Sequence, residues 1–368
     1  MVEWKKLGEV CKVLRGKRLT KSQLNESEGY PVLHGGSTPM GYYEEFNRKA
    51  NTTVVVNTGN AGCVFFYDKE FWSSDACFSL YPNKEIIDKF LYLYVYGCER
   101  ILKGKIRAGA MPTIDAKAVE DLFIPIPSLS EQQRIVSILD TFTSSISNLK
   151  QQIEERRKQY EYERETLFTE FTKTKTIGEL TKVFSCPRVY KDQWKDSGIP
   201  FWRSSDVMSY YNKVQNPRGK VYISESLYKD LSKKTEKIEK GDILVTGGGT
   251  IGIPYLKKDN TPLFVKDADL ICIKKSESII PSYLYHFFFS TGFQLYLKKI
   301  THDATIAHYT IGQIIDTPVP IPSLTEQSRI VSILDTFEQS IANLEEQLAM
   351  REKQYEYYRE KLLRFEEA

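Results

Sequence analysis

The sequence predicts an α+β protein in which two globular domains of mixed α/β content are separated by two long helices that form an antiparallel coiled coil. Two observations support this fold class. The phrase IPIPSLSEQQRIVSILDTF begins at Ile124 and returns as VPIPSLTEQSRIVSILDTF at Val319, 195 residues later. Residues 125–167 and 320–362 agree at about 30 of 43 positions, and both copies show the apolar period of a helix. The chain is therefore an internal duplication with pseudo-twofold symmetry.

The duplication divides the chain into a globular domain (1–124), a helix (125–171), a second globular domain (172–319) and a second helix (320–368). The globular domains repeat more faintly. LGEVCKVLRG from Leu7 resembles IGELTKVFSC from Ile177, and YPVLHGGSTPMGYY from Tyr30 resembles IPFWRSSDVMSYY from Ile199. With 368 residues, 41% of them hydrophobic, both domains can bury an apolar core. No stretch resembles a signal peptide or a membrane span, which predicts a cytoplasmic protein without membrane contact.

Each repeated segment has the start signal and the period of a long helix. Ser130 and Thr325 are the expected N-caps, and Glu131 and Glu326 follow at the positive end of the helix dipole. The apolar residues then alternate in steps of four and three over more than four heptads, so each helix should bury this seam against the other. The predicted coiled-coil residues are Ile135, Leu139, Phe142, Ile146, Leu149, Ile153, Tyr160 and Leu167 in the first copy, and Ile330, Leu334, Phe337, Ile341, Leu344, Leu348, Tyr355 and Leu362 in the second.

Arg156 and Arg351 interrupt the two seams at matching positions. They either fix the register of the helix pair or extend their charged ends to solvent. About 40 residues per helix would give a length of roughly 60 Å at 1.5 Å per residue.

Charge is unevenly distributed along the chain. The net charge is +3 overall, but it is +2 for residues 1–124 and +7 for residues 172–319, against −2 and −4 for the two helical segments. Basic globular parts joined by acidic helices suit a protein whose domains meet a polyanion and whose helices meet other proteins.

The sequence contains no recognisable catalytic motif. The Asn/Asp-Pro-Pro-aromatic tetrapeptide of amino-methyltransferases and the phosphate-binding P-loop are both absent. The six cysteines are dispersed and are expected to be buried free thiols, and the spacing of His302 and His308 fits no common zinc pattern. The glycine cluster VTGGGTIGIP, which contains Gly247 to Gly249 and Gly252, is either a tight turn between strands or a place where backbone approaches a nucleic acid closely.

These features together resemble the DNA-specificity subunits of type I restriction-modification systems. The matching features are the [IV]-P-[IVL]-P-x-L-x-E-Q phrase at both helices, the L-G-E-V-like start of each globular half, the G-D-I-L-V-x-x-x-G-x-x-G segment and the duplicated layout. The resemblance covers essentially the whole chain.

The resemblance implies a non-catalytic, sequence-specific subunit with two target recognition domains, each reading one half of a bipartite, asymmetric site in double-stranded DNA. It implies that the helices set the spacer between the half-sites and dock two methyltransferase subunits, and that restriction/translocase subunits are indirect partners. No cofactor or metal is then expected on this chain, whereas S-adenosylmethionine, ATP and Mg are expected on partner subunits.

The expected DNA contacts are basic loop residues for the phosphates and forked or amide side chains for the bases. Arg203, with the three residues after it, is the preferred base-reading cluster, and His34 to Ser37 is its counterpart in the first domain. The candidates are Arg15, Lys17, Arg18, Lys21, His34, Ser37, Lys103, Lys105 and Arg107 in the first domain, and Arg188, Lys191, Arg203, Ser204, Ser205, Asp206, Lys298, Lys299, His302, His308 and Tyr309 in the second.

Three other interpretations stay open from the sequence. A close relative could serve a methyltransferase outside the type I class. The chain could itself modify DNA, which methyl transfer by the purified chain would reveal, or it could be a coiled-coil scaffold that binds only protein. Binding of random duplex DNA at two salt concentrations separates the scaffold from the other two.

Overall fold

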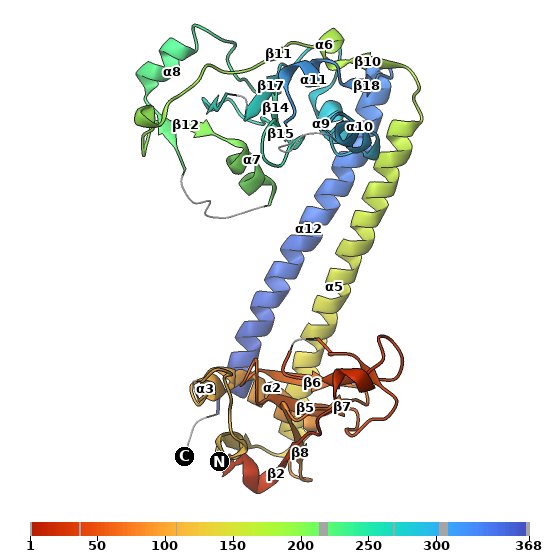
Figure 1. Ribbon diagram of the computed structural model, residues 1–368, viewed down its shortest axis with the longest axis vertical. Helices are drawn as coiled ribbons and strands as arrows, with labels where there is room; N and C mark the ends of the chain where they lie inside the picture. The colour runs from red at the N-terminus through yellow and green to blue at the C-terminus, as the bar shows by residue number, and fades with distance from the viewer. Residues whose placement is uncertain are drawn as a thin grey trace. The chain divides into compact units, whose positions relative to one another are not determined.

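The computed structural model describes residues 2–36, 38–107, 109–212, 220–267, 269–301 and 308–365 (Figure 1). The chain forms two compact units. The first unit comprises Met1–Lys150 and Glu346–Ala368, and the second comprises Gln151–Glu345. The boundary between the units thus falls inside both long helices. Among the described helices, none combines the length and the apolar character that a bilayer span requires.

The described residues of the first unit form three small sheets. Its entry and exit strands pair antiparallel, the next sheet has the order β2-β8-β5-β6, and the third has the order β4-β3-β7. The strands are β1 (Glu3–Lys6), β2 (Cys11–Arg15), β3 (Tyr30–Leu33), β4 (Tyr42–Tyr43), β5 (Thr52–Val56), β6 (Val64–Tyr67), β7 (Trp72–Ser73), β8 (Cys77–Pro82) and β9 (Phe123–Ile126). The short helices are α1 (Leu7–Val10), η1 (Lys21–Gln23), α2 (Asp88–Gly97), α3 (Glu99–Lys103) and α4 (Ala116–Glu120).

The second unit repeats this topology strand for strand. Its sheets are β10-β18, β11-β17-β14-β15 and β13-β12-β16. The strands are β10 (Thr174–Thr176), β11 (Val183–Phe184), β12 (Ile199–Trp202), β13 (Tyr222–Ile223), β14 (Ile243–Thr246), β15 (Pro254–Leu256), β16 (Phe264–Val265), β17 (Leu270–Ile273) and β18 (Pro318–Pro320). The helices are α6 (Ile177–Leu180), η2 (Lys191–Gln193), α7 (Ser204–Tyr211), α8 (Glu225–Leu231), α9 (Pro281–Phe287), α10 (Thr291–Thr301) and α11 (Ile311–Ile315).

The central strands explain why both domains adopt the same fold. β5 and β14 lie in the middle of their four-stranded sheets, and every residue of both strands is buried. Such β-branched and aliphatic runs fit a strand that is covered on both faces. The mixed α/β character of both globular domains and the internal duplication predicted from the sequence are therefore confirmed.

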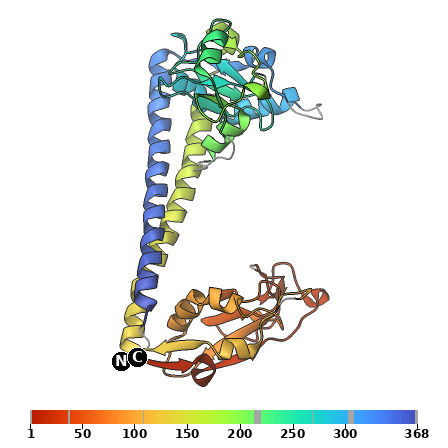
Figure 2. The ribbon, with the colours of Figure 1, turned by 90° about the vertical axis from the view of Figure 1, so that its left-hand side faces the viewer.

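The two long helices are α5 (Leu129–Thr169) and α12 (Leu324–Leu363). Within the first unit, Phe142 stacks on Tyr358 with ring centroids 5.3 Å apart, and Lys150 Nζ lies 3.0 Å from Glu352. As residue numbers rise along α5 they fall along α12, so the helices pair antiparallel there (Figure 2).

The second unit shows the same arrangement between the other halves of the helices. Arg157 pairs with Glu345 at 2.7 Å, and Tyr160 lies against Phe337. All sixteen predicted seam residues fall in the described part of the chain, and none of them is exposed. Arg156 and Arg351 place their guanidinium groups over the rings of Phe337 and Phe142, at 5.7 and 5.6 Å from the centroids. The two arginines thus use the seam aromatics as cation–π partners.

The predicted N-caps are wrong by two residues. The helices begin at Leu129 and Leu324, and the hydroxyl oxygens of Ser128 and Ser323 accept hydrogen bonds from the backbone N–H groups of Glu131 and Glu326. The caps are therefore the serines directly before each helix. The first residues of the predicted helical segments belong to β9 and β18, which pair antiparallel with the entry strands β1 and β10.

Candidate nucleic-acid interface

In the first unit, several loops meet where strands β3 and β5 end. We name residues 15–18, 34–36, 57–60, 73–76, 107 and 109–113 the loop edge of the first unit. The backbone N–H of Asn60 donates to the Gly35 carbonyl at 3.1 Å, and His34 Nδ1 lies 2.9 Å from Ser74 Oγ. Lys17 N–H donates to the Ser73 carbonyl at 2.9 Å. Hydrogen bonds between backbones, together with the contact between His34 and Ser74, hold these loops together.

The second unit brings the corresponding loops together. Its loop edge comprises residues 203–206, 247–250, 266–267, 269 and 308. Ser204 Oγ donates to the Asp269 carbonyl at 2.7 Å, and the Gly247 N–H donates to the same carbonyl at 2.8 Å. Lys266 Nζ pairs with the Asp269 carboxylate at 2.9 Å. Asp269 therefore ties the loop after β12 to the loop after β14.

A turn with two left-handed glycines forms the centre of each loop edge. Gly249 and Gly252 have φ values of 73° and 76° between strands β14 and β15, which confirms the tight-turn interpretation of this glycine cluster. Gly59 and Gly62 have φ values of 88° and 81° between β5 and β6. A Cβ on Gly249 would meet nothing within 4 Å, so the backbone is open at this point.

The comparisons with known proteins agree with this duplicated architecture. The family described as "Type I restriction modification DNA specificity domain" matches residues 1–156 and 170–350. This chain belongs to that family. It is therefore a type I restriction-modification specificity subunit, a non-catalytic component that provides DNA sequence recognition.

Two curated relatives and two solved structures match this chain over almost its full length. A putative type I restriction enzyme specificity subunit of Haemophilus influenzae is 31% identical and covers 99% of this chain and 96% of its own. The EcoR124I/EcoR124II specificity subunit of Escherichia coli is 26% identical over 99% and 94%. The crystal structure of the S subunit of a type I system from M. genitalium has a TM-score of 0.66 at 18% identity, covering 100% and 97%. A chain from a structure of a type I complex has a TM-score of 0.60 at 18% identity, covering 99% and 97%.

Most of the predicted DNA-contact residues of this specificity subunit are exposed. The loop edge of the first unit contains Arg15, Lys17, Arg18, His34 and Arg107, and that of the second contains Arg203 to Asp206 and His308. The exposed candidates are Arg15, Lys17, Arg18, Lys21, His34, Lys103, Lys105, Arg107, Arg188, Lys191, Ser205, Lys298, Lys299 and His308. Ser37 and His302 lie outside the described residues.

Several basic candidates already have acidic partners. Arg107 pairs with Asp115, Lys103 Nζ lies 2.6 Å from Glu99, and Arg188 Nε lies 2.9 Å from Asp267. Ion pairs between exposed groups are weak, typically below about 1 kcal/mol. A phosphate could replace the acidic partner at low cost, and these contacts remain predictions.

The preferred base-reading residue Arg203 is half-buried and firmly held. Its Nε and Nη2 atoms donate to the two carboxylate oxygens of Asp206 at 2.9 and 3.3 Å, and its guanidinium lies 5.9 Å from the Trp194 ring centroid. Asp206 also accepts from the Arg203 backbone N–H. Arg203 and Asp206 are therefore a connected pair at the start of α7, and the role of the four-residue cluster in base reading remains a prediction.

Tyr309 requires a correction. Its side chain is fully buried in the hydrophobic core of the second unit, where its ring lies against Phe293 and its hydroxyl contacts Thr317. Burial raises the pKa of its phenol. Tyr309 comes directly after the exposed His308 in the sequence, but its own side chain lies in the core. It therefore supports the loop edge from within and has no exposed surface that DNA can contact.

Sequence reasoning missed polar residues at both turns. Thr58 is half-buried and Asn60 is exposed on the turn of the first unit, and Thr250 is exposed at the corresponding place in the second. The G-x-x-G spacing after a buried strand occurs in both halves, so the second-half cluster could have located the first.

Arg48 was also not predicted from the sequence, and it supports the loop edge of the first unit from a half-buried position. Its Nη2 donates to the Arg15 carbonyl at 3.0 Å and its Nε donates to Ser79 Oγ at 2.8 Å. Burial lowers the pKa of its guanidinium, which nevertheless stays charged in proteins. Arg48 thus holds backbone from a half-buried position, whereas the exposed Arg15 donates its Nε–H to the Asp75 carbonyl at 2.8 Å.

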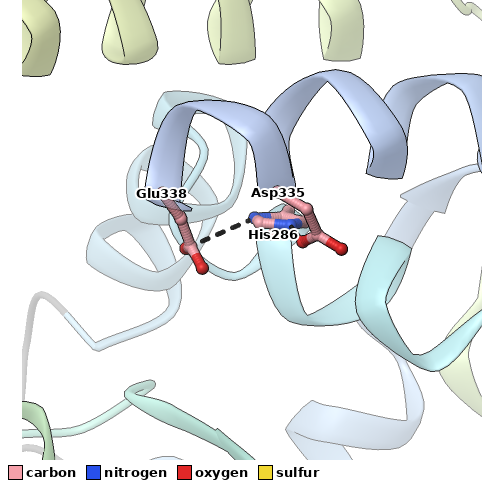
Figure 3. Close-up of side chains that lie close together, drawn as sticks. All are labelled: His286, Asp335 and Glu338. Carbon is pink, nitrogen blue, oxygen red and sulfur yellow. Dashed lines mark hydrogen bonds and ion pairs between the residues drawn. The ribbon is translucent and has the colours of Figure 1, made fainter. Parts of the chain in front are cut away.

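Among the described residues, one cluster could hold a metal ion. It consists of His286, Asp335 and Glu338, where α9 meets α12 in the second unit (Figure 3). None of these residues belongs to either loop edge.

Proposed function

We propose that this specificity subunit reads a bipartite, asymmetric DNA sequence, with one half-site for each globular domain. The observation that carries the proposal is the repetition of one topology with different side chains at the loop edge. His34 and Arg203 follow the equivalent strands β3 and β12, and Asn60 and Thr250 occupy equivalent turn positions. Two domains that share one topology but present different polar groups are suited to recognise two different base sequences.

In the same proposal, the helix pair determines the spacer between the half-sites and docks two methyltransferase subunits. The support is the repeat itself, because a duplicated helical surface offers the same contacts twice. Restriction/translocase subunits join the complex indirectly. The partner subunits bind S-adenosylmethionine, ATP and Mg²⁺, and this chain binds none of them.

Methylome sequencing of cells that express the complete complex tests the assignment of half-sites. Variants are made at one loop edge at a time, for example Asn60→Ala in the first domain and Thr250→Ala in the second. Each change should alter the methylated bases of one half-site and leave the other intact. A variant in one domain that alters both half-sites equally would refute the proposal.

The number of methyltransferase subunits is tested separately by native mass spectrometry of the purified complex. Two copies per specificity subunit are expected. A single copy at saturating methyltransferase concentration would contradict the duplicated docking surface while leaving the assignment of half-sites intact.

A further inference from the structure

Four polar side chains meet where α9 packs against α5 and α12 in the second unit. His286 is fully buried, and its Nε2 lies 2.8 Å from Asp335 Oδ1. Its Nδ1 lies 3.1 Å from the Tyr160 hydroxyl and 3.8 Å from Glu338 Oε1. The Tyr160 hydroxyl lies 3.0 Å from the same Glu338 oxygen. Figure 3 shows His286 between Asp335 and Glu338, both carried by α12.

The available protons do not satisfy this cluster when His286 is neutral. A carboxylate only accepts, so the ring proton belongs on Nε2, where it donates to Asp335. Nδ1 is then an acceptor. It faces the Tyr160 hydroxyl together with Glu338 Oε1, and one phenol proton cannot serve both. Three electron-rich atoms therefore surround a small space that a cation would stabilise.

We propose that this space binds one divalent transition-metal ion of the zinc class, ligated by His286 Nδ1, Glu338 Oε1 and Tyr160 Oη. The three atoms are separated by 3.1, 3.0 and 3.8 Å. Ligands with bonds of about 2.0 to 2.1 Å around a tetrahedral ion lie roughly 3.3 Å apart, so the triangle has the required size. Imidazole and carboxylate are ordinary zinc ligands.

The surroundings supply what such a site needs. Metal-bound histidines usually donate their second ring N–H to a carboxylate, as His286 does to Asp335. The two positive charges of a divalent ion neutralise both carboxylates, whereas the single positive charge that a second proton gives His286 would neutralise only one. Asp335 and Glu338 also line an open cavity of about 640 Å³, which gives the ion an entry path.

The first unit offers an internal comparison. The Ile87 N–H donates to Gln132 Oε1 as the Ile280 N–H donates to Gln327 Oε1, which aligns the start of α2 with the start of α9. Leu93 lies six residues after Ile87, just as His286 lies six residues after Ile280, so Leu93 corresponds to His286. Thr143 corresponds to Glu338, because the two positions are separated by the 195-residue offset of the repeat. Leu93 is buried in a hydrophobic cluster against which Tyr355, the counterpart of Tyr160, packs. The same junction thus folds with two ligands replaced.

These natural replacements provide the test variants. The untagged full-length chain is treated with chelator, dialysed and titrated with Zn²⁺ by calorimetry, and bound zinc is counted by mass spectrometry. One ion per chain is expected for the wild type, and none at this site for His286→Leu or Glu338→Thr. Asp335→Asn should weaken binding about 10- to 100-fold, and Asp140→Asn, its counterpart in the first unit, should not change it.

The outcomes separate the alternatives. Zinc that binds equally to His286→Leu belongs to thiols or other histidines and overturns the proposal. A wild type that binds no zinc while the His286→Leu variant folds normally shows that a second proton on His286 fills the space. The titration needs neither DNA nor methyltransferase, so its result is independent of the function proposed above.

Discussion

Arg203 and His34 occupy equivalent positions but are held by different partners. His34 Nδ1 contacts Ser74, whereas the guanidinium of Arg203 is shared between Asp206 and the Trp194 ring. These partners hold the guanidinium of Arg203 in one orientation. Bidentate hydrogen bonding to a base requires a guanidinium with such a fixed orientation.

Arg203→Ala is predicted to weaken the reading of one half-site by about 1 to 3 kcal/mol and to leave the other half-site unchanged. Binding of the assembled complex to duplexes that vary in one half at a time measures the effect. His34→Ala is the matched change in the first domain and should act on the opposite half. A loss that is equal for every duplex would identify Arg203 as a phosphate contact.

Gln132 and Gln327 join each long helix to its globular domain. Gln132 is fully buried, accepts from the Ile87 N–H and donates to the carbonyls of Glu85 and Pro127. Removing a side chain that satisfies buried backbone groups costs roughly 1 to 3 kcal/mol.

Gln132→Ala is therefore predicted to lower the free energy of unfolding by that amount, measured by denaturant titration of the first unit's transition. Gln133→Ala, an exposed neighbour on the same helix, should change it by less than about 0.5 kcal/mol. Equal effects of the two changes would show that the buried hydrogen bonds of Gln132 contribute no net stability.

The sequence could indicate which residues are basic and lie in loops, but not which of them are already engaged. Arg48 and Arg15 look alike in the sequence, yet Arg48 is half-buried and donates to two backbone carbonyls, whereas Arg15 is exposed and donates to one. Tyr309 follows His308 directly and still faces the core. These differences depend on partners distant in the sequence, such as Ser79 for Arg48 and Phe293 for Tyr309, which local pattern cannot supply.

At the scale of elements, the long helices were the most predictable part because a heptad repeat is a local and redundant signal. Their starts were placed two residues late, since the phrases SLSE and SLTE each offer two hydroxyl residues. Ser128 and Ser323 are selected because each stands three residues before the N–H group that it caps. Strands of two residues, such as β4 and β13, carry too few positions for a period and are defined only by their partners.

The helix seam gives a prediction at this scale. The double change Ile146→Asp and Ile341→Asp places a charge at two partly buried seam positions, which should cost at least about 2 kcal/mol per site. We expect a lower melting temperature by circular dichroism and loss of methyltransferase recruitment. The exposed pair Ser147→Asp and Ala342→Asp adds the same charge outside the seam and should leave both properties near wild type. Recruitment that survives the seam change would show that pairing is unnecessary for docking.

At the scale of the whole molecule, the helices are proposed to act as a ruler. Four residues inserted after Asn148 and after Asn343 add about 6 Å to each helix and keep the apolar seam nearly in phase. With base pairs about 3.4 Å apart, the unread spacer should lengthen by one or two base pairs while both half-sites keep their bases. Methylome sequencing reads this directly. An active complex with an unchanged spacer would exclude the helices as the element that sets the distance.

The composition of the first unit has a consequence for synthesis of the chain on the ribosome. Residues 346–368 belong to this unit, and Tyr355, Leu362, Leu363 and Phe365 pack against its hydrophobic core. The 195 residues Gln151–Glu345 are translated in between, which takes about 10 to 40 s at roughly 5 to 20 residues per second. The first unit is thus translated first but completed last. Part of its hydrophobic core stays exposed until residues 346–365 of the second long helix have been made. Stop codons introduced between residues 346 and 355 should therefore destabilise the first unit and leave the second unit, which precedes them directly in the sequence, intact.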